Sequence, residues 1–142
     1  MMEESLNTKF QQLILRFHQQ GGELPPLEKF DITPAQVVYL DYLAKHPACR
    51  LTQLTTALQY SAASVSVMVS LLEAKGLVKK TQEAQDARAR SLVLTEKGLQ
   101  VVSEIEAFRN KRIEMILKAL DEAEKKTLLD LLEKAMPKKE EK

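Results

Sequence analysis

The segment from residue 61 to residue 98 constrains the fold of this chain more than any other part. Its first half repeats apolar residues at helical spacing, namely Val65, Met68, Val69 and Leu72. Gly76 follows, where a helix needs a residue in the left-handed conformation to terminate. Residues 78 to 81 and 91 to 94 are short and contain β-branched side chains, as strands do. Helix, glycine, strand, polar stretch and strand in this order predict a β-hairpin directly behind a helix.

The stretch between the two predicted strands reads EAQDARARSL, residues 83 to 92. It contains Asp86, Arg88 and Arg90 but no large apolar residue before Leu92. Residues 50 to 97 hold seven basic and four acidic side chains, whereas the net charge of the whole chain is +1. A charged stretch of this kind is often only a solvated loop. Its position between two strands that follow a helix favours a binding function instead.

Helical patterns cover most of the remaining chain. We expect an amphipathic helix over residues 5 to 20, followed by a break at GGELPPLEKF. Thr33, Pro34 and Gln36 carry the signature of a capped helix start, and this second helix should reach about Lys45. Further helices are expected over residues 50 to 58, after the cap Ser61, after the cap Thr95 and from Asp121. Three short helices followed by a hairpin predict a mainly α fold, a winged helix-turn-helix with a two-strand wing.

Four stretches of the sequence form a set: DITPAQVVYLDYL, LTQLTTAL, SAASVSVMVSLLEAKGLV and DARARSLVLTEKG. As a set, which covers roughly residues 32 to 98, they resemble the MarR-type transcriptional regulators. In that family the wing carries an aspartate, an arginine two positions later and a Leu-Thr pair after a fixed gap. Asp86, Arg88, Leu94 and Thr95 keep this spacing. The resemblance implies a regulator that binds DNA.

The resemblance also implies that the first helix and the last two helices pair with those of a second copy. The sequence agrees, because these terminal helices carry more apolar residues than a small DNA-binding lobe could cover. We expect four parts: an N-terminal dimerisation helix and loop (1–32), a winged-helix DNA-binding lobe (33–96), C-terminal dimerisation helices (97–136) and a frayed tail (137–142).

The predicted wing has a specific chemistry toward DNA. A hairpin tip can reach the minor groove, and arginine suits this electronegative slot because its charge is permanent and weakly hydrated. We expect Arg88 to enter the groove. Asp86 would orient Arg88 by a charge-assisted hydrogen bond, a role that the resemblance also implies. Four cations are expected to contact phosphates without reading sequence: Arg90 on the wing, and Lys75, Lys79 and Lys80.

The fourth predicted helix departs from the family, whose members often place lysine or arginine on its outward face. The candidate DNA contacts here are Ser61, Ala62, Ser64, Ser66, Val67 and Ser70. Serine can donate to base edges or phosphates, and valine or alanine can contact a thymine methyl, but none makes a bidentate contact to guanine. We expect either readout of AT-rich or deformable DNA through shape and wing contacts, or a lobe that binds protein. The alternative is that Ser61, Ser64 and Ser66 serve as caps and helix-surface residues, and for Ser61 capping is favoured over base contact.

Regulators of this architecture often sense small molecules in an apolar crevice between the DNA-binding lobe and the dimer helices. Phe17, His18, Tyr39 and Tyr42 lie on the first two predicted helices and are candidates for binding a small aromatic or anionic effector. A purely structural interpretation is favoured, since such aromatic residues are usually core and a histidine on a surface helix is usually just exposed.

Cys49 is the one cysteine of the chain. Lys45, His46 and Arg50 are close in sequence and could lower its pKa, as in a redox sensor. Its position differs from that of the sensing cysteine in thiol-responsive relatives, near the start of the first helix. An incidental thiol is therefore the favoured interpretation.

Other classes of protein find little support in the sequence. Two histidines and one cysteine give no usual zinc site, and there is no glycine-rich phosphate loop and no placed nucleophile–base pair. No apolar run approaches the roughly 18 residues of a membrane span, and the first ten residues are acidic and polar, unlike a secretion signal. We expect a cytoplasmic protein that is not an enzyme and has no membrane partner, metal or cofactor.

The interpretation is a dimeric, sequence-specific transcriptional regulator that binds a near-palindromic site in double-stranded DNA. We expect a repressor that a small-molecule effector releases. The alternative is a winged-helix module that binds protein and has little or no affinity for DNA.

Overall fold

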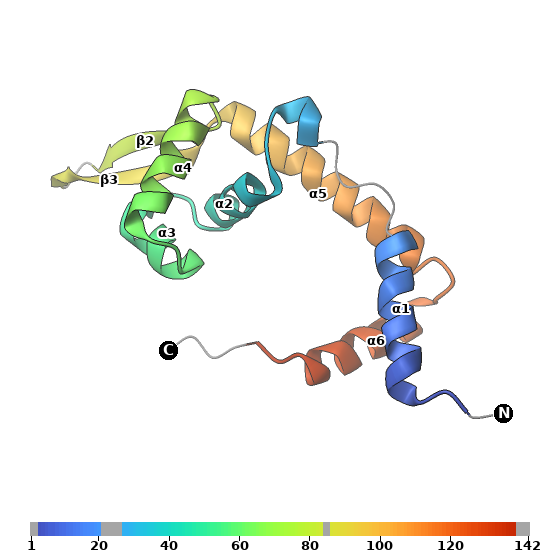
Figure 1. The fold of residues 1–142 in the computed structure, drawn as a ribbon. Helices are drawn as coiled ribbons and strands as arrows, with labels where there is room; N and C mark the ends of the chain where they lie inside the picture. Colours follow the sequence, from blue (N-terminus) through green and yellow to red (C-terminus); the bar gives the residue numbers. More distant parts are fainter. Residues whose placement is uncertain (1–2, 21–26, 84–85, 139–142) are drawn as a thin grey trace. The chain divides into compact units, whose positions relative to one another are not determined.

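The computed structural model describes residues 3 to 20, 27 to 83 and 86 to 138; the side chains of residue 20 and of residues 83 to 90 are not among those it describes. The chain divides into two units (Figure 1). The core unit is Leu24–Phe108. The terminal unit combines Met1–Glu23 with Arg109–Lys142. We describe each unit by itself.

The core unit is a small helical lobe with one sheet. Its elements are η1 (Leu27–Phe30), α2 (Pro34–Lys45), β1 (Cys49–Arg50), α3 (Leu51–Leu58), α4 (Ala62–Ala74), β2 (Val78–Glu83), β3 (Asp86–Leu94) and the first part of α5 (Glu96–Ile116). The capped start of α2 is confirmed, because the backbone N–H of Gln36 donates to the Thr33 hydroxyl and the Gln36 side chain accepts from the Thr33 N–H. Gly76 has φ +75°, as the predicted helix end requires.

The sheet has three antiparallel strands in the order β1-β3-β2. The hairpin of β2 and β3 confirms the predicted wing, with Val78 opposite Leu94 and Gln82 opposite Arg90. Both strands extend further toward the tip than predicted. Strand β1 was not predicted: Cys49 pairs with Leu92, so the segment that leads into α3 is also tied to the wing.

One hydrophobic core holds the unit together. Its buried residues include Leu40 and Leu43 of α2 and Leu54 of α3, and α4 buries the predicted stripe Val65, Val69 and Leu72. Strands β2 and β3 add Val78, Leu92 and Leu94, and α5 adds Val101 and Ile105. Because each element contributes its apolar face to this one core, the outward faces of α4 and the wing are held in fixed positions.

The start of α5 is fitted closely against the end of α4. The Thr95 hydroxyl donates to the carbonyl oxygen of Gly76 at 2.6 Å and accepts from the N–H of Gly98 at 3.0 Å, so Thr95 caps α5 as predicted. A side chain at Gly98 would collide with the backbone carbonyl of Leu77. Glycine is therefore required here for close approach, although its conformation is helical.

The terminal unit consists of α1 (Leu6–Gln20), the last part of α5 and α6 (Glu122–Ala135). The predicted start of α6 is confirmed by a capping box between Asp121 and Glu124. Among its described residues, neither α1 nor α6 has a buried side chain. The described residues of this unit therefore form helices but no core that is closed from solvent.

Candidate nucleic-acid interface

Helices α3 and α4 form the corner on which the candidate interface is built. Their axes are bent by 116° relative to each other, within the range of helix-turn-helix motifs. The turn between them uses Gln59 in the left-handed conformation at the end of α3 and Ser61 as the N-cap of α4. The Ser61 oxygen accepts from the N–H of Ser64 at 3.1 Å, which confirms the predicted cap.

The outward face of α4 carries no charged side chain. The exposed residues of the helix are Ala62, Ala63, Ser64, Ser66, Val67, Ser70, Leu71 and Ala74. Glu73 is the only charged residue between Ala62 and Ala74, and its carboxylate pairs with Lys80 of β2 at 3.4 Å. All six predicted recognition residues are thus exposed, and their contact with DNA stays a prediction.

The wing lies beside α4 and extends away from it (Figure 1). The predicted wing residues Asp86, Arg88 and Arg90 belong to β3. Their side chains are not among those that the structure describes. Residues 84 and 85, between the two strands, also lie outside the described residues. Nearer the core the pairing is regular, because Lys80 lies opposite Leu92 and Thr81 opposite Ser91. The structure thus gives these wing residues a backbone position, and their roles toward DNA stay predictions.

The three lysines predicted to contact phosphate have different surroundings. Lys79 and Lys80 are exposed on β2, and Lys80 reaches Glu73. The Lys75 ammonium instead donates to the carbonyl oxygen of Asp31 and to Oε1 of Gln36, the latter at 3.1 Å. Lys75 therefore ties the end of α4 to the start of α2, and its ammonium must leave these partners to reach a phosphate.

The four candidate effector residues fall into different units. Phe17 and His18 are exposed on α1 of the terminal unit, in edge contact with each other. Tyr39 belongs to the core of the other unit, where it is 3% exposed and stacks on Tyr60. Burial and the neighbouring Tyr60 raise the pKa of Tyr39. A structural role is thus favoured for Tyr39, and a shared effector pocket stays a prediction.

Tyr42 and Cys49 lie close to one another in sequence but differ in environment. Tyr42 is half-buried and stacks on His46 with ring centroids 4.1 Å apart. Cys49 is buried in β1, and its thiol donates to the carbonyl oxygen of Arg50 at 3.3 Å. Burial raises the pKa of Cys49, which contradicts the alternative of a thiol activated by neighbouring cations and agrees with the favoured interpretation, an incidental thiol.

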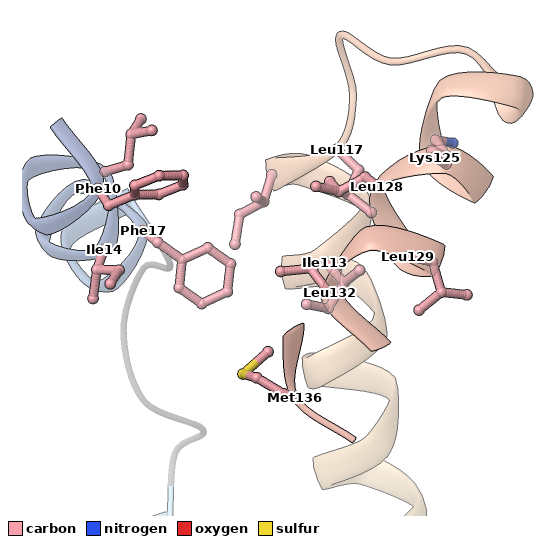
Figure 2. A pocket seen from close by; sticks show the side chains of 12 residues that line it. Phe10, Ile14, Phe17, Ile113, Leu117, Lys125, Leu128, Leu129, Leu132 and Met136 are labelled. Atoms are coloured by element: carbon pink, nitrogen blue, oxygen red, sulfur yellow. The ribbon is translucent and has the colours of Figure 1, made fainter. Parts of the chain in front are cut away.

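The terminal unit contains an apolar cavity of about 640 Å³. Figure 2 shows Phe10 and Phe17 of α1 pointing toward a second apolar side that includes Ile113 and Leu132. Among the described residues that line it, Lys125 is the one that is charged; the others are Leu13, Ile14, Ile116, Leu117, Leu128, Leu129 and Met136. Apolar side chains that face an open cavity of this size are typical of a surface that a partner covers.

In the part of the chain that the structure describes, no group of three or more histidine, cysteine, aspartate or glutamate residues could hold a metal ion. Over the same residues, no single helix is both long and apolar enough to cross a bilayer; the bent pair of α3 and α4 meets the criteria of length and composition together.

The fold and the exposed helix-turn-helix corner define a winged-helix protein, and comparison with known proteins gives its family. The family model described as "MarR family" matches residues 30–89. The HTH-type transcriptional repressor MdtR of Bacillus subtilis is 30% identical over 120 residues, which cover 84% of this chain and 74% of the repressor. The chain belongs to the MarR family.

Solved structures of S. aureus MepR are similar over nearly the whole chain. MepR bound to ethidium bromide has a TM-score of 0.74 and 26% identity, with 94% of this chain and 95% of MepR covered. The MepR–DNA complex has a TM-score of 0.63 and 26% identity, with 94% and 98% covered. With the repressor MdtR, these relatives identify the chain as a DNA-binding transcriptional regulator and confirm that it is not an enzyme.

Proposed function

We propose that the protein is a dimeric, sequence-specific repressor that binds a near-palindromic site in double-stranded DNA. The observation that carries this proposal is the fixed placement of α4 and the wing on one core. A helix of this kind can enter a major groove while the hairpin beside it reaches the adjacent minor groove. Repression is supported by the likeness to MdtR, which is a transcriptional repressor.

Dimer formation is supported by the terminal unit. Phe10, Ile14 and Leu132 are 61%, 58% and 44% exposed, although all three line its apolar cavity. A second copy that packs its own terminal helices onto this surface would remove these side chains from water. Two-fold symmetry then places two wings and two α4 helices on one duplex, with half-sites about one helical turn apart.

Release by a small-molecule effector is the third part of the proposal. It rests on the likeness to MepR, which binds ethidium bromide, a planar aromatic cation. Phe17, His18, Tyr39 and Tyr42 remain the proposed contacts for an aromatic or anionic effector. A direct test is titration of the protein–DNA complex with aromatic ligands of either charge. Dissociation by one of them supports this part, and a complex unaffected by every such ligand contradicts it.

DNA binding is tested by fluorescence anisotropy with a mixed pool of duplexes at several salt concentrations. We expect the affinity to fall steeply as salt rises, because lysine and arginine contacts release counterions. Arg88→Ala should weaken binding by about 1 to 3 kcal/mol if Arg88 contacts bases. Arg16→Ala, on α1, is the matched control and should bind like the wild type.

Two results would contradict this proposal. If Arg88→Ala and Arg16→Ala reduce DNA affinity by the same amount, the wing is not part of the DNA interface. No binding to any duplex at low salt would favour the alternative, a module that binds protein, for which the uncharged face of α4 is the supporting observation.

A further inference from the structure

The outward face of α4 combines exposure with an unusual chemistry for a helix next to DNA. Helical spacing places Ala63, Val67, Ser70 and Ala74 along its centre. Val67 is 62% exposed and Leu71, one turn later, is 47% exposed. A helix of a monomeric lobe has little reason to place two branched apolar side chains in water, so this face is suited to contact an apolar group on its partner.

Base chemistry excludes most modes of direct readout by this face. A bidentate contact to guanine needs arginine or lysine, and one to adenine needs asparagine or glutamine. None of these four residue types occurs between Ala62 and Ala74. The apolar group that a major groove does offer is the C5 methyl of thymine, and valine, alanine and leucine are complementary to it.

The hydroxyl groups of α4 are compatible with the same partner. Ser61 donates its hydroxyl hydrogen to the Ser64 oxygen at 2.8 Å while it caps the helix. Ser64 therefore acts as acceptor in this pair, and its own hydrogen can point to an acceptor such as thymine O4 or a purine N7. Exposed Lys79 and Lys80 on neighbouring β2 supply the positive charge that a duplex requires.

We propose that α4 reads thymine through its methyl group, with Val67 as the residue that determines specificity. Ala63 and Leu71 flank Val67 by one turn on either side and complete the apolar surface. The preferred site then carries thymine where α4 meets the major groove, and guanine is not selected there. This inference rests on the proposed DNA-binding function and adds the chemical group that is recognised.

The test removes the methyl group and nothing else. The preferred duplex is first selected from a random pool with the wild-type protein. Each thymine of a half-site is then replaced by uracil, which lacks only the C5 methyl. Burial of one methyl group changes an equilibrium about four-fold, so the critical substitution should weaken binding about four-fold in one half-site and about fifteen-fold in both.

The variant Val67→Ala assigns the effect to this side chain. It should bind the thymine and uracil duplexes nearly equally, because alanine at this position lacks the two γ-methyl groups of valine that would reach the thymine methyl. Val38→Ala on α2 is the matched control: Val38 is also exposed, at 43%, and this variant should keep the wild-type ratio. Both sites are exposed, so both variants should retain the wild-type melting temperature, which is measured alongside.

The outcomes separate this inference from the proposed function. A selected duplex whose affinity is unchanged by uracil at every position overturns the role of the methyl group but leaves DNA binding intact. A uracil effect that persists in Val67→Ala overturns the role of Val67. If no duplex is selected at low salt, the proposed function fails and this inference fails with it.

Discussion

The core unit and the terminal unit are rich in the same kinds of apolar residue but use them differently. In the core unit, Leu40, Leu54 and Leu72 are fully enclosed. In the terminal unit, Phe10, Ile14 and Leu129 are 61%, 58% and 55% exposed. Both units contain helices whose apolar residues recur at helical spacing. The difference shows that one unit completes its core within a single chain, whereas the described helices of the other do not, and this supports the proposed dimer.

The largest effect is expected for a charge on the apolar side of α1. Ile14→Glu places a carboxylate in the terminal cavity, and the symmetry of the proposed dimer would repeat it in the second copy. A buried unpaired charge is costly, so the free energy of dimer formation should become less favourable by about 4 kcal/mol or more. The dissociation constant of the dimer should then rise about a thousand-fold. Sedimentation equilibrium measures this constant.

Gln19→Glu provides the control for that prediction. Gln19 is exposed on the opposite side of α1 by helical spacing, and the substitution adds the same charge. It should leave the dimer intact. If both variants dissociate equally, or neither does, the apolar side of α1 is not the dimer surface.

The second prediction compares the same truncation in the two units. Leu54→Ala leaves a cavity in a closed core and should lower the free energy of unfolding by about 2 to 5 kcal/mol at any protein concentration. Leu129→Ala should act through association, so its effect on the melting temperature should shrink when the protein is concentrated. Thermal unfolding over a range of concentrations tells the two apart. If Leu129→Ala lowers the melting temperature by the same amount at every protein concentration, the terminal unit is stable without a second copy.

The third prediction concerns two glycines, Gly76 directly after α4 and Gly98 in the first turn of α5. Gly98→Ala favours the helix by about 1 kcal/mol but drives a methyl group into the Leu77 carbonyl, for a net loss of about 1 to 3 kcal/mol. A methyl group at Gly76 would meet no atom within 4 Å, so Gly76→Ala adds only the strain of a left-handed backbone, which costs about 1 kcal/mol. Denaturant unfolding gives both values. A stabilised Gly98→Ala would show that α5 does not approach Leu77 this closely.

The fourth prediction concerns the start of α4. Ser61→Ala removes the side-chain oxygen that accepts from the Ser64 N–H and should cost about 1 kcal/mol. Ser66→Ala, at an exposed position five residues further along the chain, should change the free energy of unfolding by less than about 0.5 kcal/mol. Equal values from denaturant unfolding would show that the cap does not stabilise the core unit.

The smallest effect is a pH dependence at Cys49. Burial raises its pKa above the ordinary 9.0, so the folded state holds the thiol proton more tightly than the unfolded chain. The resulting stability is present below that ordinary value and is lost as pH rises through the raised pKa. Cys49→Ser removes this titration and should flatten the decline in unfolding free energy with alkaline pH. An unchanged decline would show that another group is responsible.

Local signals made much of the fold predictable. The caps at Thr33, Ser61 and Asp121 and the left-handed Gly76 need only neighbours in sequence, and all are confirmed. Strand β1 was missed because its two residues are defined by pairing with distant Leu92 and carry no periodicity of their own. The same long-range packing buries Cys49, whose environment could not be inferred from the charges adjacent in sequence.

The candidate site was predictable to a similar extent. Periodicity alone places Val67 and Ser70 on the outward side of α4, and both are exposed. It could not show that the Lys75 ammonium would reach Asp31, which lies 44 positions earlier in the chain. The sequence favoured a core role for Tyr39 over a place in a pocket, and packing across elements shows that it belongs to the core.

The mass of the protein–DNA complex tests the central claim most directly. Sedimentation equilibrium of the full chain with the selected duplex should give two chains per duplex, and a dimer when DNA is omitted. One chain per duplex, or a free chain that stays monomeric at the concentration where it binds, would contradict a dimer that presents two α4 helices and two wings to a single site.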